Sequence, residues 1–226
     1  MRRRTAMGGL RATALTVIAL TVISLALTGA ARATPCCGPI TPDGERLARF
    51  LDGTGVDHLW LAKYKVNWMT GESLVAGAPK ATHCSAFVAA MSARLGVYVL
   101  RPPEHVQDLL ANAQMGWLRD AGAASGWRSL PDPVAAQAAA NRGDLVVEAF
   151  QNPNPVQPGH IAIVRPSEQS REALDRDGPR ETQAGATNAL NISTKGGFSH
   201  HSGAWLPEGR GDIRYYAHPI DWAKVP

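Results

Sequence analysis

The sequence is poor in cysteine and has no long run of charge of either sign. Three cysteines in 226 residues are too few for a disulfide scaffold. The 22 glycines and 16 prolines follow no repeat, which excludes a collagen-like chain. Hydrophobic residues make up 45% of the chain and charged residues 19%, which argues against a disordered protein and is typical of one globular domain.

The basic excess is confined to the N-terminus. The formal net charge of +4 suggests an anionic partner at first. Residues 1–33 contain five arginines and no acidic residue, however, which leaves 18 basic and 19 acidic side chains in the remainder. The remainder therefore lacks the basic excess that binding to nucleic acid requires, and we expect no nucleic-acid partner.

Residues 1–33 have the pattern of a secretory signal peptide. A basic stretch to Arg11 precedes an apolar run over residues 12–27, and a small-x-small pattern ends at Ala33. These features predict cleavage after Ala33 and a secreted or periplasmic protein, residues 34–226, that forms a single domain. An uncleaved membrane anchor is the alternative, because the run is nearly long enough to span a bilayer. No second apolar stretch approaches that length, so we expect no membrane contact after cleavage.

An odd number of cysteines leaves at least one thiol of an exported protein without an intramolecular partner. Cys36 and Cys37 are adjacent and can form a vicinal bridge, pair with another chain or remain free. Cys84 is left over. A lone thiol is prone to oxidation in an oxidising compartment unless it is buried or has a function. Cys84 is therefore a stronger functional candidate than the Cys36–Cys37 pair.

The first half of the mature chain is predicted to be helical and the second half extended. Apolar residues at helical spacing predict helices at four places: after a cap at Asp43, over residues 82–95, from Pro102 onward with Val106 and Leu109 on the buried side, and over residues 134–140. Strands are predicted over residues 145–147, 160–164, 181–186 and 213–217, with a loop over 151–159 and an exposed polar excursion over 167–180. Helices followed by an antiparallel sheet predict an α+β fold.

Cys84 is the first candidate functional residue. A helix N-cap at Thr82 or His83 places it in the first turn, where unpaired N–H groups and the helix dipole favour thiolate over thiol. A cysteine in this position is a candidate nucleophile. The alternative is a small buried residue on the core face, because Cys84 lies three and four residues before Phe87 and Val88.

His160 begins the second predicted strand and is the candidate base. Alternation places His160, Ala162 and Val164 on one face of this strand. We expect the small Ala162 to let a helix approach that face, which brings the imidazole to the thiol. The alternative is an ordinary hydrogen-bonded histidine at a strand start.

A polar side chain on the next strand can accept the proton of the second imidazole nitrogen and so fix the ring's tautomer. Gln183 and Asn188 are the candidates for this third residue. The alternative is that both are ordinary polar residues of a loop or turn.

Four segments in this order resemble the papain-like cysteine amidases and peptidases of the NlpC and CHAP group. They are His-Cys-Ser-Ala-Phe-Val, Gly-Asp-Leu-Val, Gly-His-Ile-Ala-Ile-Val and a strand ending in Gln-Ala-Gly, within a resemblance that covers about residues 64–217. Those enzymes hydrolyse peptide or amide bonds in bacterial peptidoglycan. The resemblance implies a papain-like fold in which the nucleophile begins a helix packed on an antiparallel sheet.

The resemblance also implies roles at individual positions. Cys84 matches the nucleophile, His160 the base and Gln183 the orienting third residue, with Asn188 as the alternative. Tyr64 corresponds, at a longer spacing, to the tyrosine that helps shape the oxyanion site in NlpC-like members. His83 stands where many members have Asp before the cysteine.

We therefore expect an exported cysteine hydrolase that acts on peptidoglycan peptides and uses no cofactor. A catalytically silent domain of the same fold, which binds cell-wall material or a partner protein, is one alternative. An acyltransferase with the same cysteine–histidine chemistry is another. The remaining histidines and the Cys36–Cys37 pair match no ligand spacing of a structural zinc site, so we expect no metal.

Overall fold

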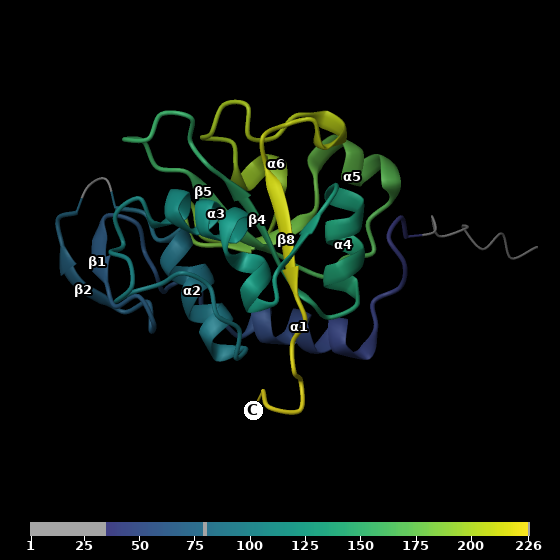
Figure 1. Cartoon of the computed structure of the whole chain (residues 1–226), viewed down its shortest axis with the longest axis horizontal. Helices are drawn as coiled ribbons and strands as arrows, with labels where there is room; N and C mark the ends of the chain where they lie inside the picture. The colour runs from purple at the N-terminus through teal and green to yellow at the C-terminus, as the bar shows by residue number, and fades with distance from the viewer. Residues whose placement is uncertain (1–34, 79–80, 226) are drawn as a thin grey trace, which may run out of the picture. The chain divides into compact units, whose positions relative to one another are not determined.

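A six-stranded antiparallel sheet with helices on both faces forms the centre of the structure (Figure 1). The computed structural model describes residues 35–78 and 81–225. The predicted signal peptide, residues 1–33, lies outside them. Within the described residues, no helix has the length and apolar character needed to cross a bilayer.

All six strands of the sheet come from the second half of the chain. Its spatial order is β3 (Arg128–Leu130), β8 (Arg214–His218), β4 (Leu145–Phe150), β5 (His160–Val164), β6 (Arg180–Gln183) and β7 (Ala189–Ser193). A separate hairpin consists of β1 (Tyr64–Val66) and β2 (Ser73–Ala76). The sheet therefore contains the four predicted strands, together with β3 and β7, which were not predicted.

The helices confirm the α+β class. They are α1 (Pro42–Asp52), α2 (Cys84–Arg94), α3 (Leu110–Asp120), α4 (Pro133–Asn141), α5 (Arg171–Asp177) and α6 (Thr194–Gly197), with short 3₁₀ turns η1 (Gly122–Ser125) and η2 (Pro207–Gly209). α1 is capped by the Thr41 hydroxyl, which accepts from the N–H of Gly44, rather than by Asp43 as predicted. The predicted exposed excursion contains α5, which Leu174 anchors in the interior.

The predicted helix from Pro102 is wrong. Residues 102–109 form turns, and α3 begins at Leu110. The physical reason lies at Leu109, whose φ of +53° is left-handed and cannot continue a right-handed helix. Val106 consequently remains 69% exposed instead of facing the core.

The two faces of the sheet bury two separate apolar clusters. α2 packs with Ile161 and Ile163 on one face, and α4 packs with Ala162 and Val164 on the other. The prediction that the helix bearing Cys84 covers the Ala162 face is therefore wrong. The space beside the small Ala162 is filled by the alanine-rich α4 and by Phe198, whereas α2 is buried around most of its circumference and occupies the deeper core.

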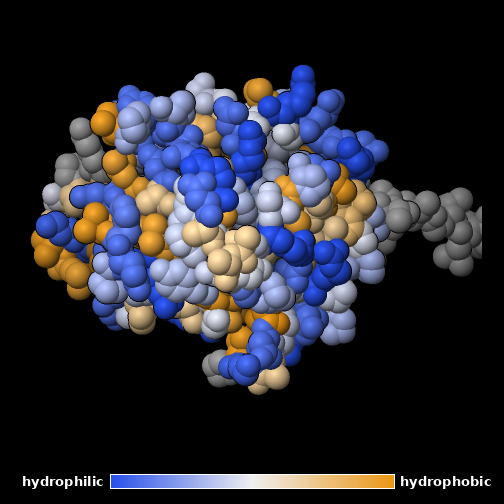
Figure 2. Space-filling view, in the orientation of Figure 1, coloured by the Kyte–Doolittle hydropathy of each residue, from blue (hydrophilic) through white to orange (hydrophobic). Residues whose placement is uncertain are grey.

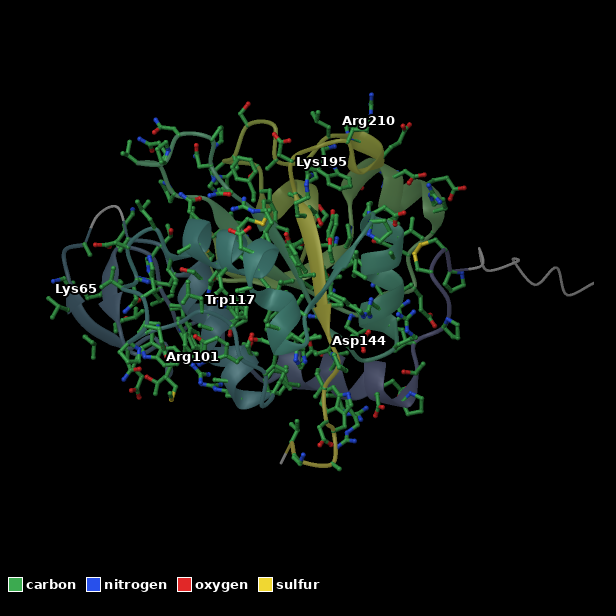
Figure 3. The ribbon with its side chains drawn as sticks, viewed as in Figure 1. Lys65, Arg101, Trp117, Asp144, Lys195 and Arg210 are labelled. Atoms are coloured by element: carbon green, nitrogen blue, oxygen red, sulfur yellow. A yellow bond between two sulfur atoms is a disulfide. The ribbon has the colours of Figure 1, made fainter. Side chains whose placement is uncertain are left out.

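Cys36 and Cys37 form a vicinal disulfide, which decides between the three states considered for them (Figure 3). The backbone N–H of Cys36 donates to the carbonyl of Gln169, which ties this bridge to the domain. Cys84 is the free cysteine, and it is buried.

Two glutamates lie together in the interior beside the small Ala162. Glu148 on β4 and Glu181 on β6 are both fully buried and interact electrostatically, and Thr194 Oγ1 donates to Glu148 at 2.7 Å. Burial raises the pKa of Glu148 to about 7 and raises that of Glu181 well above its ordinary value. At least one of the two is therefore protonated when the protein folds near neutral pH.

This pair predicts a loss of stability with rising pH. The folded-state pKa values lie above the ordinary 4.5, so the stabilisation is complete below about pH 4.5 and is lost as the pH rises through about 7. The midpoint of thermal unfolding, followed by circular dichroism, should fall by a few degrees between about pH 5 and 7.5. Glu181→Gln retains the volume and a hydrogen-bond donor but does not titrate, so its midpoint should fall less. Equal falls in both proteins would contradict the assignment.

Candidate active site

Cys84 is the first residue of α2 and lines a cleft of about 560 Å³. His83 is the N-cap residue, as the sequence allowed. The Cys84 side chain is only 4% exposed, and its neighbours in the cleft wall include Thr82, Leu109 and Gln157. The thiol thus lies at the bottom of an opening rather than on an outer surface.

The pKa of the Cys84 thiol moves in the direction opposite to the prediction. Burial raises it, and this effect outweighs hydrogen bonds from the N–H groups of Ile161 and Ser85, which lower it. The helix start therefore supplies the expected N–H groups, but the loss of solvent is larger. In the resting protein the sulfur is a neutral thiol at physiological pH.

His160 begins β5 and its ring is held by Gln183. His160 Nε2 lies 2.5 Å from Gln183 Oε1, and Gln183 Nε2 donates to the carbonyl of Thr187 at 3.0 Å. Because the amide nitrogen of Gln183 is used by Thr187, its oxygen faces the ring and accepts from Nε2–H. The second ring nitrogen, Nδ1, is then an acceptor with a free lone pair.

Aromatic rings pack against the His160 imidazole. Phe198 meets it edge-on with ring centres 4.6 Å apart, and His201 stacks on it at 5.4 Å with the planes 18° apart. Burial and, to a smaller extent, the proximity of His201 lower the pKa of His160 to about 4, against the opposing hydrogen bond to Gln183. The imidazole is consequently neutral at physiological pH and able to accept a proton.

Asn188 holds a loop and makes no hydrogen bond to the His160 ring. Its Nδ2 donates to the carbonyls of Val56 and Leu59 at 2.7 and 2.8 Å, and its Oδ1 accepts from the N–H of Gly185 at 3.0 Å. A Cβ at Gly185 would lie 3.3 Å from the His160 ring. Asn188 therefore fixes the loop that borders the imidazole, while Gln183 contacts the imidazole itself.

Tyr64 reaches the helix start through its backbone. Its carbonyl accepts from His83 Nε2 at 2.9 Å, whereas its phenol lines a neighbouring cleft of about 510 Å³. Burial lowers the pKa of His83, with this hydrogen bond opposing the shift. His83 thus connects the β1–β2 hairpin to the residue before Cys84, a role for which the sequence contained no signal.

Asn112 of α3 positions His160 and was not singled out from the sequence. It donates to the carbonyl of Gln157 and accepts from the N–H of Asn152, so it holds both ends of the loop before β5. A Cβ on Gly159 would lie 2.2 Å from the Phe150 carbonyl and 2.4 Å from Asn112 Oδ1. Only glycine fits between these groups, and this fixes the backbone on which His160 is carried.

Cys84 and His160 line two neighbouring clefts, which together are named the groove. The cleft beside His160, of about 270 Å³, also contains His200 and His201 and shares four wall residues with the Cys84 cleft: Thr82, Gln157, Pro158 and Gly159. The sulfur is contacted by the N–H of Ile161, the residue after His160. Among the described residues, no direct hydrogen bond joins the thiol to the imidazole.

Comparison of the sequence with protein-family models and with curated proteins finds no match. Within residues 35–78 and 81–225, no group of three or more His, Cys, Asp or Glu side chains is arranged to hold a metal ion. The side chains of Cys84, His160 and Gln183 therefore provide the basis for a proposal about the chemistry of the site.

The raised pKa of Cys84 predicts the pH dependence of its alkylation. The thiolate is the reactive form, so the rate with iodoacetamide should be low at neutral pH and still rising at about pH 9. Mass spectrometry of the alkylated protein measures the rate, and the same protein unfolded in urea provides the reference thiol. A plateau across neutral pH would instead reveal a preformed thiolate–imidazolium pair.

Proposed function

We propose that this protein is a papain-like cysteine hydrolase of the NlpC and CHAP type, which cleaves peptide or amide bonds in bacterial peptidoglycan. One observation carries the proposal. Gln183 holds His160 in the tautomer that leaves Nδ1 free as an acceptor, in the groove that also contains the free thiol of Cys84. A nucleophile, a base and a residue that orients the base are the parts that covalent acyl transfer requires.

In the first half-reaction the Cys84 sulfur attacks the carbonyl carbon of the amide, and its proton passes to His160 Nδ1. The N–H of Cys84 at the helix start donates to the developing oxyanion. The C–N bond then breaks, and His160 returns the proton to the leaving nitrogen. The products of this step are a free amine and a thioester on Cys84.

In the second half-reaction water attacks the thioester carbonyl and gives one proton to His160. The C–S bond breaks, the sulfur recovers its proton from His160, and a carboxylic acid leaves. Because the thiol and the imidazole are both neutral at rest, proton transfer accompanies the attack, as it does for a serine nucleophile. The two steps require none of the chemistry of a metal or an organic cofactor.

Peptidoglycan is proposed as the substrate because two independent features point to it. The motifs around Cys84 and His160 resemble those of cell-wall hydrolases, and residues 1–33 predict export to the compartment that contains the wall. Adjoining clefts on either side of Cys84 support an extended substrate.

The decisive experiment compares the mature protein with Cys84→Ala on purified peptidoglycan. Mass spectrometry of the soluble fragments should show new amine and carboxyl ends with the wild type and none with Cys84→Ala, which removes the nucleophile while alanine favours the helix. A Cys36→Ser, Cys37→Ser double variant is the matched control, because the vicinal pair lies outside the groove, and it should retain activity. Turnover by Cys84→Ala would refute the nucleophile, and binding without cleavage by the wild type would favour the silent domain.

Variants of the two amide side chains separate positioning of the base from support of the loop. Gln183→Ala should lower kcat roughly 10- to 100-fold with little change in KM, and His160→Ala roughly 10²- to 10⁴-fold. Asn188→Ala should cost about 1–3 kcal/mol of unfolding free energy, because it leaves buried carbonyls unpaired, and should lower kcat less. Steady-state kinetics and thermal unfolding distinguish these effects. A larger loss of kcat in Asn188→Ala than in Gln183→Ala would refute the role of Gln183.

A further inference from the structure

Exposed apolar side chains gather along the groove. The described residues include eight large hydrophobic side chains that remain exposed, and five of them line the connected clefts: Tyr64, Leu74, Leu109, Val106 and Val156. Figure 2 shows apolar surface in the region of the β1–β2 hairpin. Exposed apolar side chains that cluster around a concave surface mark a binding site.

The cleft at this end has two walls that are bonded to each other. Tyr64 and Leu74 of the hairpin form one wall, and Pro102 and Val106 of the turn before α3 form the other. Gln107 Nε2 donates to the carbonyl of Val66 on β1 at 3.4 Å, which connects the two walls. Leu74 is 64% exposed and Val106 69% exposed, so each presents most of its side chain to a ligand.

This apolar cleft adjoins the Cys84 cleft. The two share Ala81, His83, Gln107 and Asp108 as wall residues. The His160 cleft adjoins the Cys84 cleft through different residues, Thr82 and residues 157–159. The three adjoining clefts therefore follow one another in the order hairpin, Cys84, His160.

The position of the base gives this groove a direction. His160 protonates the leaving nitrogen, so the amine part of a substrate lies on the His160 side of Cys84. The acyl part, which becomes the thioester, then extends the other way, toward Tyr64, Leu74 and Val106. The apolar cleft is thus on the acyl side of the scissile bond.

We propose that the cleft between the β1–β2 hairpin and residues 102–108 is an acyl-side subsite that binds an apolar side chain of the substrate. This inference rests on the proposed function, because it uses Cys84 as nucleophile and His160 as base. Lys65 and Asp108 are the charged residues of the cleft wall, one of each sign, and Figure 3 shows Lys65 at the outer edge of the hairpin. The cleft therefore has no net charge that would attract a carboxylate. Its aliphatic side chains can bury an apolar group.

Peptidyl vinyl sulfones test the subsite without a known substrate, because their peptide part occupies the acyl side and their alkene adds to the cysteine sulfur. Two probes that differ only in Leu against Asp next to the electrophile are compared by the rate of Cys84 modification, measured by mass spectrometry. The wild type should prefer the Leu probe roughly 10- to 100-fold, the range that burial of a leucine side chain provides. Leu74→Asp and Val106→Asp should each reduce this preference to less than about threefold.

Val75→Asp is the matched control. Val75 is the next residue of β2, is similarly exposed and does not line the cleft, so the preference should be unchanged. The rate with iodoacetamide, which has no acyl-side group, should be the same in all four proteins. Equal rates of the two probes with the wild type would overturn the proposal, as would a preference that survives both Asp substitutions in the groove.

Other outcomes distinguish a failure of the subsite proposal from a failure of the proposed function. If the Leu probe is preferred and the preference depends on Leu74 and Val106, but peptidoglycan is not cleaved, the proposed function fails and the subsite stands. If neither probe modifies Cys84, both proposals fail. Self-association of the wild type in sedimentation experiments, lost in Leu74→Asp, would assign this surface to a second copy of the chain and overturn the subsite.

Discussion

The hydrogen bond between His160 and Gln183 is the contact on which the site depends. It fixes the tautomer of the imidazole only because Gln183 is itself fixed by Thr187 and because Gly185 leaves room for the ring. The sheet brings the two residues together, since β5 and β6 are adjacent and place both side chains on the same face. A change in the register of either strand by one residue would move one of the two to the opposite face.

Burial determines the protonation of the whole region. It keeps Cys84 as a thiol, His160 as a neutral imidazole and the Glu148–Glu181 pair partly protonated, because each charged form loses hydration in the interior. The site beneath the groove therefore contains few charges before a substrate arrives. In the proposed hydrolysis, a neutral resting site means that charge develops only in the transition state, where the N–H groups at the start of α2 are already oriented.

Much of the fold and of the candidate site could be predicted because those residues act locally. His160–Val164 was predicted with its exact bounds, and the helix of Cys84 within two residues, from apolar spacing alone. Tertiary contacts explain what was missed. β4 continues through Glu148, a residue that normally ends a buried strand, because its backbone pairs with β5 as far as Phe150. The face on which α2 packs, and the support that Asn112 gives to the His160 loop, depend on contacts between distant segments that no local pattern encodes.

The vicinal bridge and the buried thiol are chemically compatible within one chain. A thiolate attacks a disulfide and exchanges with it, whereas a thiol does not. The chain contains three cysteines, so Cys84 is the only internal sulfur that can scramble the Cys36–Cys37 bridge. Because burial raises the pKa of Cys84, little thiolate is present to start that exchange or to form sulfenic acid with an oxidant. The desolvation that keeps Cys84 as a thiol thus also preserves its reduced form among oxidants.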